Sequence, residues 1–332
     1  MNVAITGASG FIIKELLKRN LFVKNNLRYL TRRINFDIQG AKCFQADLNN
    51  RDIDITPFFS GVDLVIHGAS EVYQESLMYK TNVEGTQLLL KSLGKSRQNT
   101  KDQIHWVQLS SCGAYGVTSY QREKVVIKEN SPCNPQNEYE RTKTRADDLV
   151  IEFAKNNPWF KYTIIRPTIV FGVGMRSTAL LNIVKYIKKG IFFYVDTKES
   201  IANYVHVNDV VKAVEASLLN DLAYNEIFIV SNDCKFSEVF SSIAAELRVL
   251  PPYFVLKRNL VYSFINILGA FGKSPIKFEQ VDVLARRVEF SSQKIKDLLG
   301  WRPSAPVPVQ IRNYVKESLV MSQIASNVNQ MS

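Results

Sequence analysis

Cysteine and histidine are scarce in this sequence, and each shortage excludes a class of protein. The chain has four cysteines and three histidines among 332 residues. The cysteines lie far apart without a CxxC pair, so a disulfide scaffold is excluded and reduced thiols in a cytoplasmic protein are predicted. No two histidines have the spacing of a ligand pair, so the sequence predicts no metal site.

Long hydrophobic segments are also lacking. The apolar run 260–272 is too short to cross a bilayer, which takes about 20 apolar residues. Lys257, Arg258 and Lys273 flank it, so an interfacial helix is an alternative, but a buried helix is the favoured interpretation. Residues 1–6 resemble a strand and not a signal peptide. The sequence therefore predicts no transmembrane span.

The overall composition is that of a packed globular protein. It is 46% hydrophobic and 22% charged, which excludes a disordered or fibrous chain. The net charge of +11 suits a polyanionic partner, an anionic membrane surface or a small ligand that carries phosphate. Nucleic-acid binding has no support beyond this charge, so no nucleic-acid partner is predicted.

Short apolar runs alternate along the chain with longer stretches of helical period. We expect strands at 2–6, 27–31, 41–45, 62–66, 104–109, 162–166 and 226–230, and helices at 11–20, 80–93, 139–155 and 208–219. This alternation predicts an α/β fold, namely a Rossmann-like doubly wound parallel sheet with a smaller C-terminal substrate lobe.

The expected division of the chain follows from this pattern. We expect a Rossmann domain at residues 1–168 plus 204–231, a smaller lobe at residues 169–203 plus 232–321 and a flexible tail at residues 322–332. The motifs described next assign NAD(P) binding to the first and substrate binding to the second. No internal repeat or low-complexity linker is visible.

A glycine-containing turn follows the first expected strand. The turn, TGASGFI, places Gly7 and Gly10 between a strand and a helix, where small residues let the backbone approach a pyrophosphate. Here the sequence resembles the extended short-chain dehydrogenase/reductase family of NAD(P)-dependent sugar epimerases, dehydratases and reductases, whose fingerprint is TGxxGFxG. Ile13 replaces the third glycine of that fingerprint, which predicts a slightly displaced helix.

The end of the second strand distinguishes between the two nicotinamide cofactors. Thr31 stands where an NAD-binding member would carry an acid, and Arg32 offers a planar fork for a phosphate. NADP(H) is therefore favoured over NAD(H); the alternative is a solvated basic loop.

Further segments extend the resemblance to about residue 303. They are ADL at 46–48, VIHGAS at 65–70 (VIHLAA in the family), NVEGT at 82–86, RPTIVFG at 166–172, YVHVNDV at 204–210 and LGWRP at 299–303. His67 is favoured as a packed strand-end residue over a catalyst. The resemblance implies a cofactor site made of Gly7, Ser9, Gly10, Phe11, Ile12, Arg32, Asp47, Leu48, Gly68, Ala69, Tyr139, Lys143, Arg166 and Pro167.

Hydride transfer beside a nicotinamide also needs a proton carrier, and a tyrosine with a lysine four residues later on a helix can supply one. The spacing YxxxK begins at Tyr120, Tyr139, Tyr194 and Tyr253. Only Tyr139 opens a strong helical pattern, and its segment resembles the family's PxxxYxxxK. Tyr139 and Lys143 are therefore the predicted catalytic pair.

The third predicted catalytic residue is a hydroxyl at the end of the preceding strand. The segment SSCGAYG resembles the family's SSxxxYG, which implies that Ser111 holds the substrate oxygen. Family dehydratases carry Asp and Glu directly after this hydroxyl, whereas this chain has Cys112 and Gly113, so dehydration is not expected. Cys112 is favoured as a packing residue, although it lies beside the expected substrate.

The substrate class is the least determined feature. Many sugar-nucleotide members carry an arginine where this chain has Ala202; Arg176, Arg286 and Arg287 are candidate replacements.

We expect an oxidoreductase or epimerase that acts on a nucleotide sugar. Its expected substrate-binding residues are Ser111, Cys112, Arg176 and Arg287. A homodimer is compatible with the sequence. The alternative is an NADPH-dependent reductase or dehydrogenase of an apolar steroid-like or flavonoid-like ketone or alcohol. A non-catalytic NADP-binding sensor is less favoured.

Overall fold

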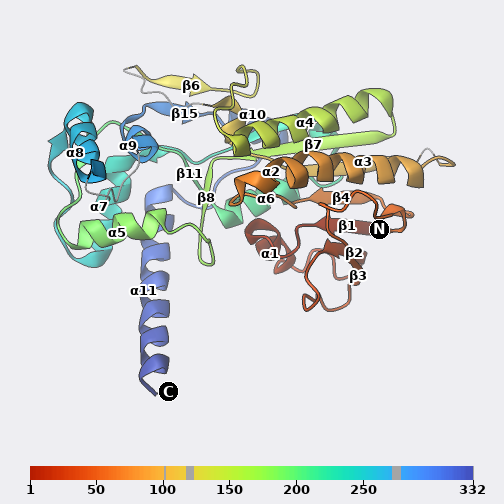
Figure 1. Cartoon of the computed structure of the whole chain (residues 1–332), viewed down its shortest axis with the longest axis horizontal. Coiled ribbons are helices and arrows are strands. Elements are labelled where there is room, and N and C mark those ends of the chain that lie inside the picture. Colours follow the sequence, from red (N-terminus) through yellow and green to blue (C-terminus); the bar gives the residue numbers. More distant parts are fainter. Residues whose placement is uncertain (101, 117–122, 271–277, 332) are drawn as a thin grey trace.

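A parallel sheet of seven strands forms the centre of the molecule (Figure 1). The computed structural model describes residues 1–100, 102–116, 123–270 and 278–331. The strands follow the order β12 (Glu226–Val230), β7 (Phe160–Pro167), β5 (Ile104–Leu109), β4 (Leu64–His67), β1 (Asn2–Thr6), β2 (Asn26–Thr31) and β3 (Lys42–Gln45). Every expected strand is confirmed, with ends that shift by at most two residues.

Helices cover both faces of this sheet. The strands alternate their side chains: Val3 and Ile5 of β1 belong to one hydrophobic cluster, and Ala4 belongs to another. The first cluster contains residues of α1 (Phe11–Leu17), α6 (Val207–Ser217) and α10 (Gln293–Leu299). The second contains residues of the 3-10 turn η1 (Thr56–Phe59), α3 (Gly85–Ser96) and α4 (Glu138–Asn156). The doubly wound α/β prediction is therefore confirmed.

The helix expected at 80–93 starts earlier and is not uniform. It begins as α2 (Glu75–Met78), continues through one stretch of π-helix, η2 (Tyr79–Glu84), and only then becomes α3. The side chain of Asn82, in the π-helical stretch, accepts hydrogen bonds from the Ser70 hydroxyl (3.0 Å) and from the Glu71 N–H (2.7 Å). Its amide group also donates to Thr142 on α4 at 3.1 Å. The 82–86 segment therefore fixes the loop after β4 against α4.

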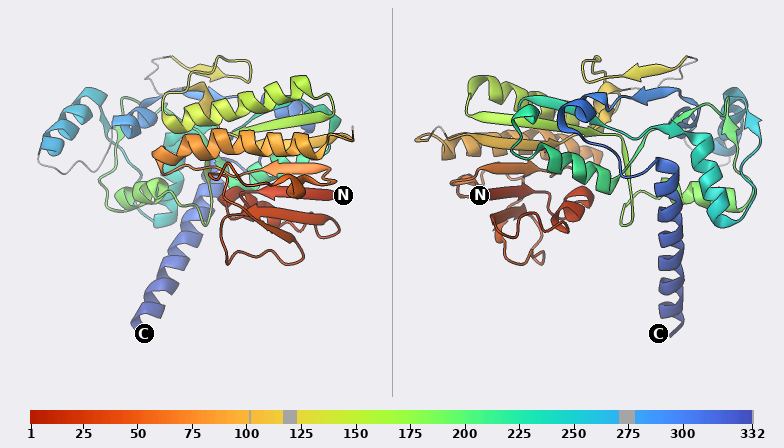
Figure 2. Two further views of the ribbon diagram at one scale, coloured as in Figure 1. Left: turned by 45° about the vertical axis from the view of Figure 1, so that its right-hand side comes forward. Right: turned by 180° about the vertical axis from the view of Figure 1, so that it is seen from behind.

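A second region with its own hydrophobic clusters lies beside the sheet (Figure 2). Its elements are β8 (Ile169–Phe171), α5 (Ala179–Lys188), β9 (Tyr194–Val195), β10 (Ile201–Ala202), β11 (Tyr204–His206), β13 (Cys234–Lys235), α7 (Phe236–Leu247), β14 (Val255–Leu256), α8 (Arg258–Ala270), α9 (Phe278–Ala285) and α11 (Val307–Met331). Short strand pairs β8–β11, β9–β14 and β10–β13 join these elements. The residues expected as a tail continue α11 as far as Met331, and the helix projects away from the body of the chain (Figure 2). Their flexibility stays a prediction.

Two segments connect this second region to the sheet. Strand β15 (Val288–Phe290) pairs with β6 (Val125–Ile127). Trp301, after α10, is buried and donates from Nε1 to the Asp209 carbonyl on α6 at 2.9 Å. The sequence predicts that the segment with α10 and Trp301 belongs to the lobe, but it packs with the helices of the sheet. The remaining boundaries of the expected division stay predictions. The other short turns are η3 (Cys112–Tyr115) and η4 (Asp221–Ala223).

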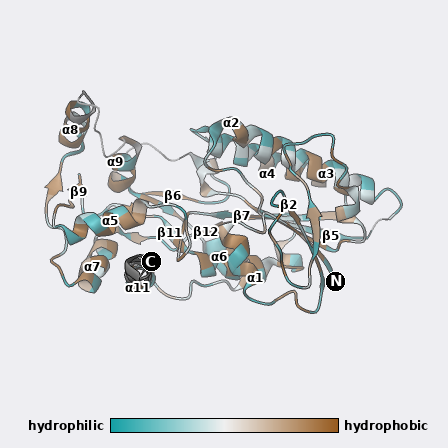
Figure 3. Ribbon diagram, turned by 60° about the horizontal axis from the view of Figure 1, so that its bottom comes forward, coloured by the Kyte–Doolittle hydropathy of each residue, from teal (hydrophilic) through white to brown (hydrophobic). Residues whose placement is uncertain are grey.

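The expectation that the apolar segment 260–272 forms a buried helix is wrong for its described part. In α8, Val261 and Ile265 are buried, but Leu260, Phe264 and Ile267 are 63%, 60% and 58% exposed. Figure 3 shows α8 at one end of the molecule, coloured by hydropathy. Residues 271 and 272 lie outside the described residues. Among the helices that the structure describes, none is both long and apolar enough to cross a bilayer.

Candidate active site

The carboxyl ends of the central strands open into a cavity of about 650 Å³. Strands β1 and β4 are neighbours, but the chain leaves β1 toward β2 and leaves β4 toward β5. Such a reversal of strand order leaves a crevice between the two connections, where α/β sheets bind ligands. The lining includes these sequence-predicted residues: Gly7, Ser9, Gly10, Phe11, Ile12, Arg32, Asp47, Leu48, Gly68, Ala69, Tyr139, Lys143 and Arg176.

The turn after β1 brings two stretches of backbone close together. Gly7 has a φ of +70°, and a Cβ atom at this position would lie 2.4 Å from the Ala69 nitrogen and the Gly68 carbonyl carbon. Gly10 donates its N–H to the Gly7 carbonyl at 2.7 Å and precedes α1. Only glycine fits position 7 on both counts, because the conformation and the space each exclude a side chain. The turn therefore leaves free room above the strand ends for a ligand.

Ile13, which departs from the family fingerprint, faces a second departure on β4. Its side chain is buried, and a Cβ atom at Gly68 would lie 2.6 Å from Ile13 Cγ1 and 2.9 Å from Ile13 Cδ1. The family motif has leucine at the position of Gly68. A large residue on the helix thus fills the space left by a small residue on the strand. The two changes compensate in volume, so the third glycine is not needed for α1 to pack here.

Basic side chains gather at the end of the cavity near β2. Thr31, Arg32 and Arg33 line it, together with Lys14 and Lys18 of α1. The two lysines were not expected from the sequence, although their spacing of four places them on one face of a helix. The Arg32 guanidinium lies 4.0 Å from the carboxylate of Glu71, another lining residue. Three backbone N–H groups donate to that carboxylate and hold the pKa of Glu71 below its usual value against the opposing effect of burial.

The predicted catalytic residues meet at the other end of the cavity. Asn137 caps α4 by accepting the Glu140 N–H at 3.0 Å, which places Tyr139 in the first turn and Lys143 one turn later. The Ser111 hydroxyl lies beside the Tyr139 phenol, close enough to favour its ionised form. The Ser111 hydroxyl oxygen accepts the Gly113 N–H at 3.0 Å. This bond fixes the orientation of Ser111 at the start of η3.

Burial perturbs both ionisable members of this group. It raises the pKa of Tyr139 to about 12, and the hydrogen bond from Ser111 opposes that rise. It lowers the pKa of Lys143, while the nearby Asp147 carboxylate favours the charged form. The Lys143 ammonium donates to the Leu109 carbonyl at 2.5 Å, at the end of β5. A half-buried tyrosine that is hard to ionise therefore lies one helical turn from a buried cation.

A buried ion pair supports this group from below. Asp147, one turn after Lys143, accepts from the Arg166 Nε and Nη2 atoms, both at 3.1 Å, and from the Ser110 hydroxyl at 2.7 Å. Asp147 and Arg166 are 0% and 4% exposed. Ser110 is thus committed to the ion pair, which leaves Ser111 as the hydroxyl beside Tyr139. The sequence resemblance implied that Arg166 contacts the cofactor, but the structure places it in this ion pair, outside the cavity lining.

Four further sequence-predicted residues do not line the cavity. Ser111 lies just behind the lining, which contains its neighbour Ser110. Pro167 ends β7, Arg287 directly precedes β15, and the Cys112 thiol donates to the Arg166 carbonyl at 3.0 Å in a buried cluster. Burial raises the pKa of Cys112, which favours the inert thiol. His67 is packed as expected, with its ring nitrogens on the Thr6 hydroxyl (2.6 Å) and the Thr86 hydroxyl (3.1 Å).

At the mouth of the cavity, Arg176 lies over the ring of Tyr73, with 5.7 Å from its guanidinium carbon to the ring centre. Among the competing tyrosines, Tyr194 is buried in the second region and Tyr253 is exposed. Tyr120 lies outside the described residues.

The residues present fit a nicotinamide dinucleotide. The glycine turn leaves room for a pyrophosphate, the basic end beside β2 suits a phosphorylated ribose, and a tyrosine and a lysine stand at the opposite end. The residues that such a cofactor would contact therefore come from the ends of β1, β2, β4 and β5 and from α4.

A family model described as "NAD dependent epimerase/dehydratase family" matches residues 3–230. N-acetyl-alpha-D-glucosaminyl-diphospho-ditrans,octacis-undecaprenol 4-epimerase of Escherichia coli O157:H7 is 28% identical over 68% of this chain and 66% of its own length. UDP-glucose 4-epimerase of Vibrio cholerae is 24% identical over 91% of this chain and 90% of its own length.

Solved structures share the fold. UDP-glucuronic acid 4-epimerase from Bacillus cereus, in complex with UDP-glucuronic acid and NAD, has a TM-score of 0.69 and 15% identity, covering 96% of this chain and 99% of its own. RMD from Pseudomonas aeruginosa, complexed with NADPH, has a TM-score of 0.66 and 18% identity, covering 95% and 98%. Because the family model spans more than half of the sequence, the chain belongs to the NAD-dependent epimerase/dehydratase family.

Proposed function

We propose that the protein is an NAD(P)-dependent epimerase that inverts a hydroxyl-bearing carbon of a nucleotide sugar. The observation that carries this proposal is that Tyr139, with Ser111 beside it, and Lys143 meet at one end of a cavity with a glycine turn. A sensor that only binds a nucleotide needs no such proton carrier. Cys112 and Gly113, where a dehydratase would need acids, favour epimerisation over dehydration.

When bound, the nicotinamide ring would accept a hydride from the sugar carbon and return it to the opposite face. The chain's own residues handle the accompanying proton. Tyr139 takes the proton from the sugar hydroxyl through its phenol oxygen and gives it back after the hydride returns. Lys143, a cation one helical turn away, would favour the phenolate against the burial that raises the pKa of Tyr139 to about 12. Ser111 donates to the same sugar oxygen and fixes its position.

The basic end of the cavity supports NADP(H) over NAD(H). Arg32, Arg33, Lys14 and Lys18 present cations where β2 ends, and Thr31 supplies no acid for a ribose diol. Glu71 lies near Arg32 and partly offsets this charge. Among the structural neighbours, one is complexed with NAD and another with NADPH.

Two of the relatives are named for sugars that carry a diphosphate, attached either to a nucleoside or to undecaprenol, and a third is named as a 3beta-hydroxysteroid dehydrogenase/decarboxylase. Arg176 lines the cavity mouth and suits such a diphosphate, with Arg287 and Cys112 as weaker candidates outside the lining. Ala202, where many sugar-nucleotide members carry arginine, is fully buried. This missing arginine favours, as the second candidate function, NADPH-dependent reduction of an apolar ketone.

Two measurements on the purified protein test the proposal. The protein is denatured and the released nicotinamide nucleotide is identified; we expect a stoichiometric amount, because an epimerase regenerates its cofactor in each cycle. The native protein is then incubated without added cofactor with UDP-glucose, UDP-N-acetylglucosamine, UDP-glucuronic acid and a polyprenol-diphosphate N-acetylglucosamine. We expect the epimer of one of them to appear in the NMR spectrum. The proposal would be contradicted if the purified protein releases no nicotinamide nucleotide, oxidises NADPH in the presence of a steroid ketone and epimerises no sugar.

A further inference from the structure

One face of α8 carries apolar side chains that no described residue buries. Leu260, Phe264 and Ile267 recur with the spacing of one helical face, and each is more than half exposed. The opposite face, with Val261 and Ile265, packs on β9 and α9. A helix that buries one apolar face and exposes another has more hydrophobic surface than its own fold uses. Exposed apolar groups of this extent mark interaction sites in soluble proteins.

The segment before α8 also exposes apolar side chains. Leu250, Tyr253 and Phe254 are 89%, 72% and 66% exposed, and β14 directly follows them. The pairing of β14 with β9 holds this segment in place, because the Tyr194 N–H donates to the Phe254 carbonyl at 2.8 Å. We call the six residues Leu250, Tyr253, Phe254, Leu260, Phe264 and Ile267 the α8 surface.

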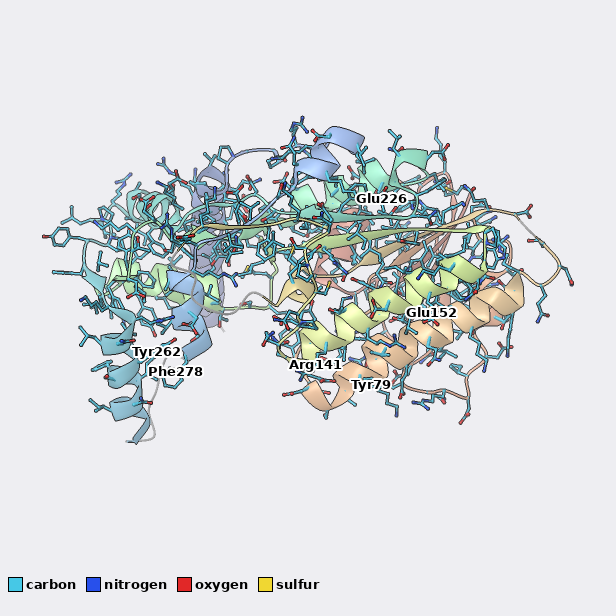
Figure 4. All side chains as sticks on the ribbon, turned by 90° about the horizontal axis from the view of Figure 1, so that it is seen from above. Tyr79, Arg141, Glu152, Glu226, Tyr262 and Phe278 are labelled. Atoms are coloured by element: carbon cyan, nitrogen blue, oxygen red, sulfur yellow. The ribbon has the colours of Figure 1, made fainter. Side chains whose placement is uncertain are left out.

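Contacts with α9 and with the residue after β9 hold α8 in place, and Figure 4 labels two of the residues involved, Tyr262 and Phe278. Tyr262 contacts the ring of Phe278 on α9, with ring centres 5.0 Å apart, and its hydroxyl bonds to Asp282. The Arg258 guanidinium contacts the same Asp282 carboxylate at 3.4 Å and lies 4.0 Å from Asp196. These bonds tie the base of α8 to α9 and β9, so the helix presents its apolar face as part of the folded lobe.

Two lysines adjoin the α8 surface. Lys198 lies over the Tyr253 ring at 5.7 Å, and exposed Lys257 directly precedes α8. The acids Asp196 and Asp282 are engaged with Arg258. The local charge is therefore positive, as is the whole chain at +11.

We propose that the α8 surface docks the protein on an anionic phospholipid membrane. Exposed leucine, phenylalanine and isoleucine enter the boundary between headgroups and acyl chains, tyrosine sits at headgroup level, and the lysines meet lipid phosphates. Neither the insertion of apolar side chains nor the attraction of lysines to lipid phosphates alone gives firm attachment, but the two together do. This docking is independent of which substrate the cavity takes, and it places the second lobe at the membrane.

Co-sedimentation with lipid vesicles tests the docking. The full-length protein is mixed with vesicles of equal parts phosphatidylglycerol and phosphatidylcholine, and with vesicles of phosphatidylcholine alone. We expect strong binding to the first and weak binding to the second. The variant Leu260→Asn/Phe264→Asn/Ile267→Asn should lose about tenfold or more in affinity. The variant Lys198→Gln/Lys257→Gln should lose about fivefold in affinity for each lysine and become less sensitive to salt.

The matched control is Val23→Asn/Leu222→Asn, which removes two apolar side chains that are 76% and 59% exposed elsewhere in the chain. It should bind vesicles as the unchanged protein does. Circular dichroism verifies that each variant folds, and Phe264→Asn alone replaces the triple variant if that one does not. Equal binding of control and α8 variants, or no preference for phosphatidylglycerol, would overturn the proposal. Light scattering offers a further check. If the protein is a dimer and the α8 variant is a monomer, the proposal is overturned, because a second copy of the chain would then cover the surface.

Discussion

The compensation between Ile13 and Gly68 predicts that Gly68→Ala destabilises the protein by steric overlap alone. A methyl group at position 68 would lie 2.6 Å and 2.9 Å from two carbons of Ile13 and 3.3 Å from Leu109 Cδ1. Normal carbon contacts lie at about 3.5–4.0 Å, so Ile13 must move within a closely packed core. Overpacking of this kind costs about 1–3 kcal/mol, and we expect about 2 kcal/mol for Gly68→Ala.

The second arm of the experiment removes the clash from the helix side. Ile13→Ala alone leaves a cavity and should cost about 2–5 kcal/mol. In the double variant the alanine at position 68 occupies part of that cavity without overlap. The loss should therefore be smaller than the sum of the single losses by about 1 kcal/mol or more, which is the coupling expected of residues in direct contact.

Urea unfolding measures all of these values, with the midpoint and slope recorded for each variant. The control is Gly94→Ala on α3, where the nearest atoms to the added methyl group are Phe153 Cζ at 3.6 Å and Cε2 at 3.7 Å. It should be neutral or stabilise by up to about 1 kcal/mol, because alanine is the better helix former. If the loss of stability in the double variant equals the sum of the losses for Gly68→Ala and Ile13→Ala within about 0.5 kcal/mol, the compensation is refuted.

Three further predictions concern stability and cofactor choice. Burial lowers the pKa of His67 and of His105 to about 3, and the nearby Lys143 adds to the effect at His67. Below about pH 6.5 the unfolded chain binds protons that these buried rings do not, so the free energy of unfolding is full above that pH and falls by about 2 kcal/mol per histidine at pH 5. Urea unfolding at a series of pH values measures this loss. Asp147→Asn leaves the Arg166 guanidinium buried without its counter-ion and should cost about 3–5 kcal/mol in the same assay; a loss under about 1 kcal/mol would mean that the ion pair is not structural. Arg32→Gln should weaken NADPH binding about tenfold and leave NADH binding unchanged, as measured by fluorescence titration; an equal effect on both would exclude a contact with the ribose phosphate.

Local patterns were enough to predict the sheet and one end of the site. The strands are apolar runs with clear ends, and Tyr139 and Lys143 are fixed relative to each other by a single helix. The position of Arg166 was not predictable, because its partner Asp147 lies on α4 and burial decides between an ion pair and a ligand contact. The compensation at Gly68 was also hidden, since it joins a helix to a strand far along the chain. The exposure of α8 depends on which of its two apolar faces the lobe covers, and both faces look alike in sequence.

The central claim is that Tyr139 carries the proton during epimerisation. The direct measurement is kcat with the sugar nucleotide that the protein epimerises, for the unchanged protein, Tyr139→Phe and Tyr194→Phe. Tyr194 has the same spacing to a lysine but is buried in the second region, so it is the matched control. We predict that Tyr139→Phe keeps its bound nucleotide and loses about a hundredfold or more in kcat, while Tyr194→Phe stays active. Full turnover by Tyr139→Phe would contradict the account.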